Sequence, residues 1–65
     1  MPIVRIEMSE GQPWEVKQKV AADVTNAIIS NTGHAKEKVF VFFYDIPRYH
    51  QANAGEMRGR PPAQP

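Results

Sequence analysis

The chain has 65 residues, a formal net charge of +1, 23% charged side chains and no cysteine. A chain this short forms at most one small domain and buries only about 60% of the surface that its unfolded form exposes, so a monomer would be marginally stable. Neither disulfides nor thiolate–metal bonds are available to compensate, which makes self-association the expected remedy. The mixed charges and the absence of a long apolar run argue against nucleic-acid and membrane partners, and we expect a soluble cytoplasmic protein.

The first predicted element is a strand over residues 2–8. Its even-numbered positions share one face and are all apolar: Pro2, Val4, Ile6 and Met8. A proline is tolerated at the first position of a strand because no hydrogen-bond donor is needed there. A turn is expected at 9–12, and Pro13 has the backbone geometry of a first helical residue.

A helix is predicted from Pro13 to about residue 32, because valines recur at helical spacing at positions 16, 20 and 24. Gly33 suits the left-handed residue that ends many helices. Residues 34–38 form a polar connection.

Residues 39–44 are almost all β-branched or aromatic, which is typical of a strand covered on both faces. Because a helix separates this strand from the first one, the two strands should be parallel with a right-handed crossover. One helix covers only one face of such a sheet, so we expect a partner subunit on the other face; a C-terminal segment folded back over it is the alternative. Residues 45–48 read as a turn, since Pro47 stops a strand.

Residues 49–57 contain a small-residue stretch that suits a loop or a short hairpin, and 58–65 hold three prolines. The predicted fold is α+β: a βαβ unit with two parallel strands, one helix and a short C-terminal hairpin, forming an oligomer. A single domain is expected over 1–57, with 58–65 as a flexible tail or an arm lying on a neighbour.

The sequence has few groups arranged for chemistry. It has no glycine-rich phosphate loop, no set of residues with metal-ligand spacing and no serine-based triad. Pro2 remains, because removal of Met1 would expose its nitrogen as a secondary amine. Burial among apolar side chains lowers the pKa of an amine, and a neutral amine near pH 7 is able to take a proton from a carbon next to a carbonyl.

The order and spacing of several short motifs resemble the 4-oxalocrotonate tautomerase family over residues 2 to about 57. The motifs are Met1-Pro2-Ile3-Val4-x-Ile6, Glu10-Gly11, Lys17-Gln18-Lys19, Lys38-Val39-Phe40-Val41 and Asn53-Ala54-Gly55. The resemblance implies a βαβ subunit in a homohexamer, built as a trimer of dimers. It also implies keto–enol tautomerisation of a small carbonyl or enol substrate without a cofactor or metal, with Pro2 as general acid and base.

The chain departs from the family pattern at four pocket positions. Family members that act on dicarboxylates carry arginines where this chain has Gln12 and Phe40. An aromatic residue usually stands at the position of Gln51, and leucine often stands at that of Ser9. We keep all four as candidate substrate-binding residues. Because an arginine fork binds a carboxylate more strongly than a glutamine amide, a monoacid or a neutral enol is a better candidate substrate than a dicarboxylate.

Two further hypotheses concern these losses. Arg48, at the end of the second predicted strand, is the candidate cation for a substrate carboxylate, in its own or a neighbouring subunit. Alternatively, the chain is a non-catalytic subunit or scaffold that completes a tautomerase-like hetero-oligomer with an active relative.

Overall fold

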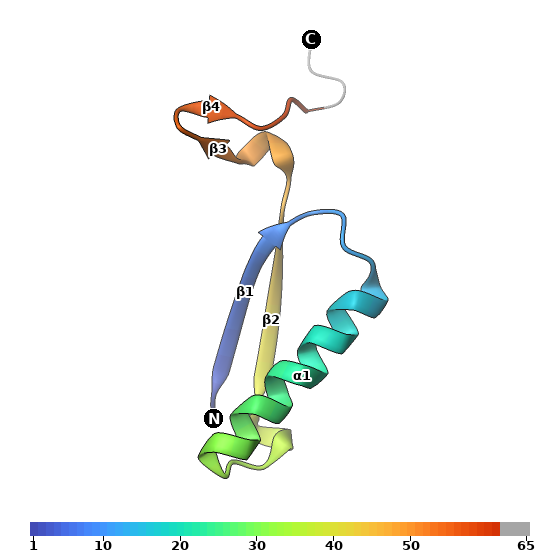
Figure 1. The fold of residues 1–65 in the computed structure, drawn as a ribbon, viewed down its shortest axis with the longest axis vertical. Coiled ribbons are helices and arrows are strands. Elements are labelled where there is room, and N and C mark those ends of the chain that lie inside the picture. The colour runs from blue at the N-terminus through green and yellow to red at the C-terminus, as the bar shows by residue number, and fades with distance from the viewer. Residues whose placement is uncertain (62–65) are drawn as a thin grey trace.

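A computed structural model describes residues 1–61. The elements in chain order are β1 (Ile3–Ser9), α1 (Trp14–Thr32), the short 3₁₀ helix η1 (Lys36–Lys38), β2 (Phe40–Ile46), a second 3₁₀ helix η2 (Arg48–His50), β3 (Ala52–Asn53) and β4 (Glu56–Met57). The predicted α+β architecture is confirmed: two parallel strands, one helix and a C-terminal hairpin (Figure 1).

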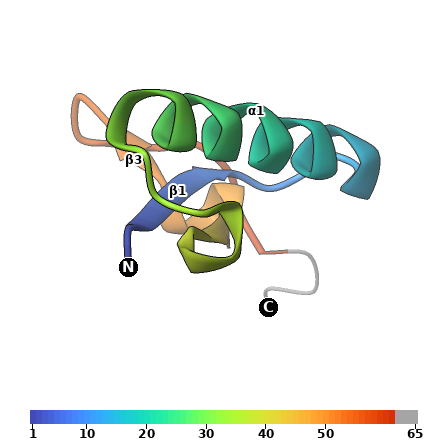
Figure 2. The ribbon, with the colours of Figure 1, turned by 90° about the horizontal axis from the view of Figure 1, so that it is seen from below.

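The two long strands pair in parallel over their full length, from Ile3 opposite Phe40 to Ser9 opposite Ile46. Exposure alternates along β1 and along β2 as far as Tyr44, as expected for a sheet with one covered face. The half-buried face lies under α1, which runs along one side of the strands (Figure 2). An ion pair between Lys17 of α1 and Asp45 of β2 links the helix to this face.

The second strand extends further than the sequence indicated. A turn was expected at 45–48, but Asp45 and Ile46 belong to β2, opposite Met8 and Ser9. The ladder continues because β1 offers partners up to its last residue, and the backbone N–H of Glu10 donates to the carbonyl of Ile46 at 3.0 Å. Pairing between distant segments therefore outweighs the local turn preference.

The helix begins one residue later than predicted. Pro13 has an extended backbone (ψ 158°) and is the cap, so Trp14 is the first helical residue. The Pro13 carbonyl still accepts from the N–H groups of Val16 and Lys17.

At its other end, α1 stops as predicted at Gly33, whose φ of 78° is left-handed and whose N–H donates to the carbonyl of Ile29 at 3.1 Å. The side chains of the last three helical residues each donate to the carbonyl four positions earlier, so they bond back onto the last turns of α1.

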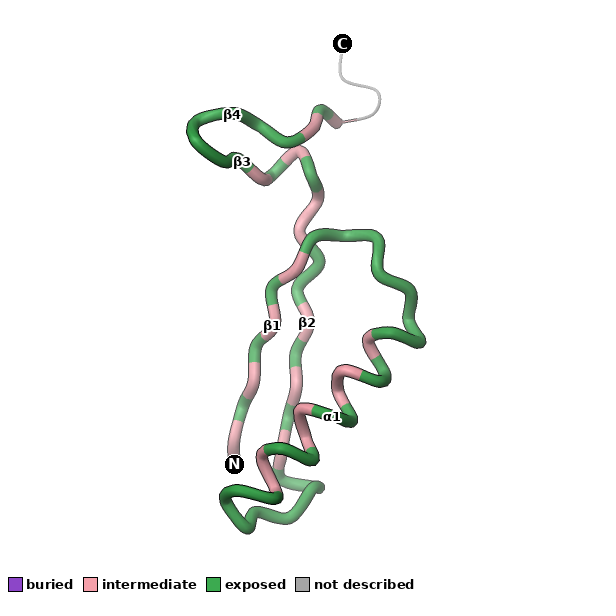
Figure 3. The backbone as a smooth tube through the Cα atoms, viewed as in Figure 1, coloured by how far each residue is buried: buried purple, intermediate pink, exposed green. Residues whose placement is uncertain are grey.

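The described residues do not form a closed core. None of residues 1–61 is fully buried, as the absence of purple in Figure 3 shows. The radius of gyration is 15.8 Å, whereas a compact domain of this length has about 11 Å. Large apolar side chains stay open on the sheet face away from α1: Ile3, Phe40, Phe42 and Tyr44 are 44–51% exposed.

The C-terminal hairpin of β3 and β4 extends beyond the end of the long strands (Figure 1). Ala54 and Gly55 form its turn with φ values of 52° and 83°. Two positive values are typical of the tight turn that joins two antiparallel strands. Of the predicted tail 58–65, residues 62–65 lie outside the described part of the chain, while the N–H of Arg58 donates to the carbonyl of Gln51 at 2.8 Å.

No helix within residues 1–61 is long and apolar enough to cross a membrane.

The Gly33→Ala variant tests the helix end. A Cβ built at Gly33 meets no atom within 4 Å, so the cost is that of a left-handed backbone alone. We expect a loss of about 1 kcal/mol in the free energy of unfolding, measured by urea denaturation at one fixed protein concentration. Gly33→Asn is the control and should lose less, because asparagine tolerates this conformation; equal losses would contradict the explanation.

Candidate active site

Pro2 lies directly before β1 and is partly exposed. Its carbonyl accepts a hydrogen bond of 3.0 Å from the backbone N–H of Phe40, so the start of β2 holds it in place. Met1 precedes it and is 71% exposed, which leaves the Met1–Pro2 bond at an open end of the molecule. The proline is thus held on its carbonyl side while its nitrogen side faces a residue that contacts solvent.

Apolar side chains surround this end of the sheet on its open face. Phe40 pairs with Ile3 in the register of the two strands, and its ring stacks near that of Phe42, with ring centres 6.5 Å apart and planes 12° apart. Phe40 is therefore the only other predicted site residue that the described chain places at the Pro2 end. It offers an apolar wall and no charge.

The opposite end of the sheet joins two other predicted site residues. The side-chain amide of Gln51 donates to the Ser9 hydroxyl at 3.0 Å and to the carbonyl of Ile46 at 2.8 Å. Both N–H bonds of this amide are thereby used, which leaves only its carbonyl oxygen for a ligand. Gln51 and Ser9 act here as an anchor between the hairpin and the ends of β1 and β2.

Arg48 lies at the same end, in η2. Its backbone N–H donates to the carboxylate of Glu10 at 3.3 Å, and its guanidinium donates to the carbonyl of Arg58 at 3.3 Å. One guanidinium N–H is thus engaged, and the remaining donors of this exposed side chain are available to an anion. Gln12 follows in the exposed loop between β1 and α1.

The six candidate residues fall into two groups separated by the length of the sheet. Pro2 and Phe40 lie at one end, and the four others lie at or beyond the opposite end. A strand rises about 3.3 Å per residue, so β1 separates the groups by about 20 Å. One chain therefore cannot bring Pro2 and Arg48 to the same small molecule.

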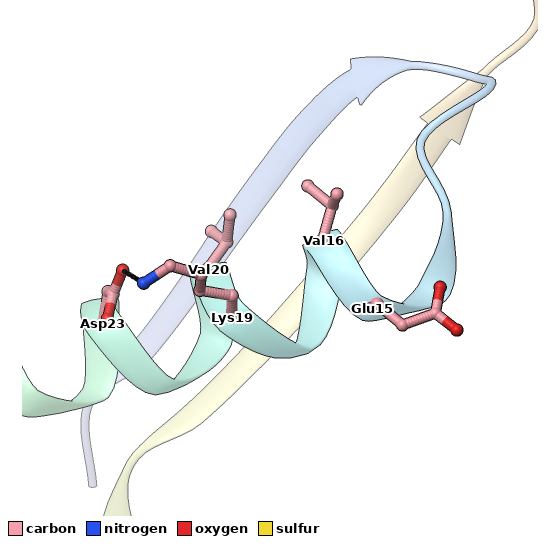
Figure 4. A pocket seen from close by; sticks show the side chains of 5 residues that line it. All are labelled: Glu15, Val16, Lys19, Val20 and Asp23. Carbon is pink, nitrogen blue, oxygen red and sulfur yellow. Dashed lines mark hydrogen bonds and ion pairs between the residues drawn. The ribbon is translucent and has the colours of Figure 1, made fainter.

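Two other features of residues 1–61 lie apart from these groups. An open groove of about 300 Å³ on the first half of α1 is lined by Glu15, Val16, Lys19, Val20 and Asp23 (Figure 4). It contains none of the candidate residues. No cluster of three histidine or carboxylate side chains suited to a metal ion occurs in the described part of the chain.

Sequence reasoning missed the roles of Glu10 and of the Gln51–Ser9 bond. The bonded residues are 42 positions apart, and Glu10 reaches Arg48 across 38 positions. Glu10 was noticed as part of a motif, but no local pattern indicates which backbone group its carboxylate would bind.

The fold agrees with the protein family that the chain matches. A family model described as "Tautomerase enzyme" matches residues 2–60. The chain belongs to the tautomerase family. A probable tautomerase from Ralstonia nicotianae is 35% identical over 65 residues, covering all of both chains. A 2-hydroxymuconate tautomerase from Bacillus subtilis is 38% identical over 56 residues, which cover 86% of this chain and 90% of the relative.

A solved structure extends the likeness to three dimensions. The crystal structure of YwhB, a homologue of 4-oxalocrotonate tautomerase, superposes with a TM-score of 0.80 at 36% identity, covering 86% of this chain and 92% of that one. The predicted family resemblance is therefore confirmed, and the chain is an isomerase of the tautomerase type. In this tautomerase, however, the six candidate site residues lie in two groups at opposite ends of the sheet formed by β1 and β2.

The anchoring role of Gln51 in this tautomerase is testable with Gln51→Ala. Loss of both donated bonds should speed amide hydrogen exchange at 52–58 several-fold and lower the free energy of unfolding by about 1–2 kcal/mol. Ser9→Ala is the matched control, because it removes only one acceptor and leaves the bond to Ile46. Equal exchange in the two variants would show that the Ile46 bond does not hold the hairpin.

Proposed function

We propose that this tautomerase transfers a proton between the oxygen and the α-carbon of an enol or keto substrate, with Pro2 as base and acid after Met1 is removed. The observation that carries the proposal is the position of Pro2 at the open start of β1, held through its carbonyl by the N–H of Phe40.

Two considerations support Pro2 in this role. The hydrogen bond from the Phe40 N–H anchors the Pro2 carbonyl to β2, so the residue that carries the amine is held at the start of the sheet before substrate arrives. Burial of the Pro2 nitrogen in an assembled pocket would favour the neutral form of the amine, because desolvation raises the free energy of the charged form. A neutral secondary amine has the lone pair that a base needs.

The proposed reaction is balanced within the enzyme. The Pro2 lone pair takes the hydroxyl proton of the enol as the carbonyl double bond forms. The resulting ammonium group returns a proton to the carbon at the other end of the enol system, which restores the neutral amine. No cofactor is needed, because the same nitrogen accepts and donates the proton.

The proposed substrate class rests on the side chains that stand at the family's pocket positions. Phe40 would offer apolar surface at the Pro2 end, and Gln12 of a neighbouring subunit would offer neutral hydrogen bonds in place of a guanidinium fork. Hydrogen bonds to ionised donors are roughly twice as strong as neutral ones, so two carboxylates would be poorly compensated. We therefore propose a monoacid or a neutral enol, such as the enol of an arylpyruvate, as substrate.

The proposed active form is a homo-oligomer, which we take to be a hexamer. The open apolar face, the lack of a closed core in residues 1–61 and the 20 Å between the two groups of candidate residues all favour it. Arg48 of one subunit would then meet a substrate carboxylate held at Pro2 of another. Residues 1–57 would form the catalytic unit, with 58–65 contributing to contacts between subunits.

The Pro2→Ala variant tests the base directly. Alanine at position 2 also permits removal of Met1, so the variant replaces a secondary amine by a primary one without changing the start of the chain. We expect kcat for ketonisation of an arylpyruvate enol to fall by about 10²- to 10⁴-fold. Intact mass establishes that Met1 is absent from both proteins.

Two results would contradict the proposal. Wild-type rates in the Pro2→Ala protein would exclude the proline mechanism. An intact wild-type mass that still includes Met1 would leave the nitrogen as an amide without a basic lone pair. In either case the scaffold hypothesis becomes the better one, and native mass spectrometry with a co-expressed relative should then show a preferred mixed assembly.

The Gln12→Arg variant tests the proposed substrate class. A guanidinium at position 12 should raise kcat/KM for the enol of a dicarboxylic acid about tenfold relative to that for an uncharged enol. Gln18→Arg, on the exposed side of α1, is the matched control for the added charge. An equal gain in both variants would point to general attraction of anions and not to binding at position 12.

A further inference from the structure

Arg48 is held from two sides, and neither contact neutralises its charge. Its backbone N–H donates to the Glu10 carboxylate at 3.3 Å, which ties the start of η2 to the residue that follows β1. Its guanidinium donates to the backbone carbonyl of Arg58, also at 3.3 Å. Within residues 1–61 no carboxylate lies within ion-pair distance of this guanidinium. The cation is therefore oriented by a neutral acceptor and keeps its charge for an anion.

Three hydrogen bonds link Arg48, Gln51 and Arg58 in a closed ring. The Arg48 carbonyl accepts from the N–H of Gln51 at 3.1 Å, and the Gln51 carbonyl accepts from the N–H of Arg58 at 2.8 Å. The Arg58 carbonyl accepts from the Arg48 guanidinium and closes the ring. Because β4 packs against η2, the chain that leaves β4 passes beside η2 and reaches this position (Figure 1). The Arg48 side chain is thus held by the same segment that its own backbone helps to anchor.

Gly59 follows this ring and lies against Arg48. The other three glycines have φ values between 78° and 113° and open space where a Cβ would stand. Gly59 has no positive φ, but a Cβ built on it lies 3.1 Å from the Cβ of Arg48 and 3.6 Å from its carbonyl carbon. Carbon atoms pack best at about 3.5–4.0 Å, so a methyl group here would press on η2. Because it meets the base of the Arg48 side chain and not a flexible end, Arg48 itself would have to move.

We propose that Gly59 is a positioning residue for Arg48: its missing side chain lets the Arg58 carbonyl reach the guanidinium and hold it ready for the carboxylate of a monoacid substrate. The inference rests on the proposed function, which gives Arg48 that carboxylate as its ligand. Gly59 itself touches no substrate. A guanidinium has five N–H donors, so one bond to a carbonyl leaves donors for a carboxylate and reduces the freedom that is lost on binding.

Two enols that differ only in a carboxylate separate Arg48 from the rest of the site: that of an arylpyruvate and that of the matching arylacetaldehyde. In Gly59→Ala, KM for the arylpyruvate enol should rise about fivefold with kcat unchanged, because a charge-assisted bond is misplaced. KM for the arylacetaldehyde enol should stay the same. Arg60→Ala removes a neighbouring cation, leaves the space beside Arg48 untouched and should behave as wild type.

An Arg48→Gln background shows whether Gly59 acts through Arg48. Arg48→Gln alone should raise KM for the arylpyruvate enol at least about tenfold, because hydrogen bonds from a charged donor are the stronger ones. Adding Gly59→Ala should then raise KM no further, since the two residues act as one unit. Equal rises with and without Arg48 would overturn the proposal, because the methyl group would then disturb the site in another way.

The order of the guanidinium is measurable without substrate. NMR relaxation of the Arg48 Nε–Hε group, assigned by its absence from Arg48→Gln, should show restricted motion in the wild-type protein. In Gly59→Ala its motion should approach that of the exposed Arg60. An Arg48 group as mobile as Arg60 in the wild-type protein, or equally restricted in Gly59→Ala, would overturn the proposal.

The two measurements distinguish failure of this inference from failure of the proposed function. The relaxation result stands whether or not Pro2 catalyses a reaction, because it needs no turnover. Restricted motion that is lost in Gly59→Ala supports Gly59 as the residue that positions Arg48. If KM for the arylpyruvate enol then stays unchanged in both Gly59→Ala and Arg48→Gln, the substrate role that the proposed function gives to Arg48 is wrong.

Discussion

The parallel pairing of β1 with β2 is the interaction on which the rest of this molecule depends. It holds together two strands that are far apart in sequence, and it fixes Pro2 through the N–H of Phe40. It also leaves a sheet with only one covered face and two edges. A parallel sheet is normally covered on both faces, so the chain is structurally incomplete as a single copy.

That incompleteness links stability to chemistry. The strand that carries Pro2 at its start carries Ser9 at its end, and Arg48 and Gln12 lie beyond that end. A site that needs groups from both ends must be made by at least two chains. Association of subunits would therefore both increase the burial of each chain and bring the two parts of the site together. In such a protein a substitution in a strand edge affects activity without touching a substrate.

The elements defined by local sequence were predictable, and the contacts between distant residues were not. Alternation identified β1, valine spacing identified α1, and Gly33 marked its end. The turn expected at 45–48 was wrong at Asp45 and Ile46, because the length of β2 depends on β1 as a partner. Among the candidate site residues, Pro2 was predicted from its position in the chain and from the family pattern.

The engagement of Gln51 was not predictable, since both of its acceptors come from other segments. The family resemblance placed an aromatic residue at this position, where apolar packing would be the natural contact. Gln51 replaces such packing by two directional hydrogen bonds to the ends of β1 and β2. Each bond contributes only about 0.5–1.5 kcal/mol net. The Gln51 amide therefore orients the hairpin more than it stabilises the hairpin.

A hairpin with little burial of its own needs further contacts to remain ordered, and the described chain offers few beyond Arg48 and Arg58. Neighbouring subunits are the natural source of those contacts. Where an aromatic side chain would bury apolar area, Gln51 supplies two directional bonds, so the hairpin is held to the ends of β1 and β2 by polar contacts.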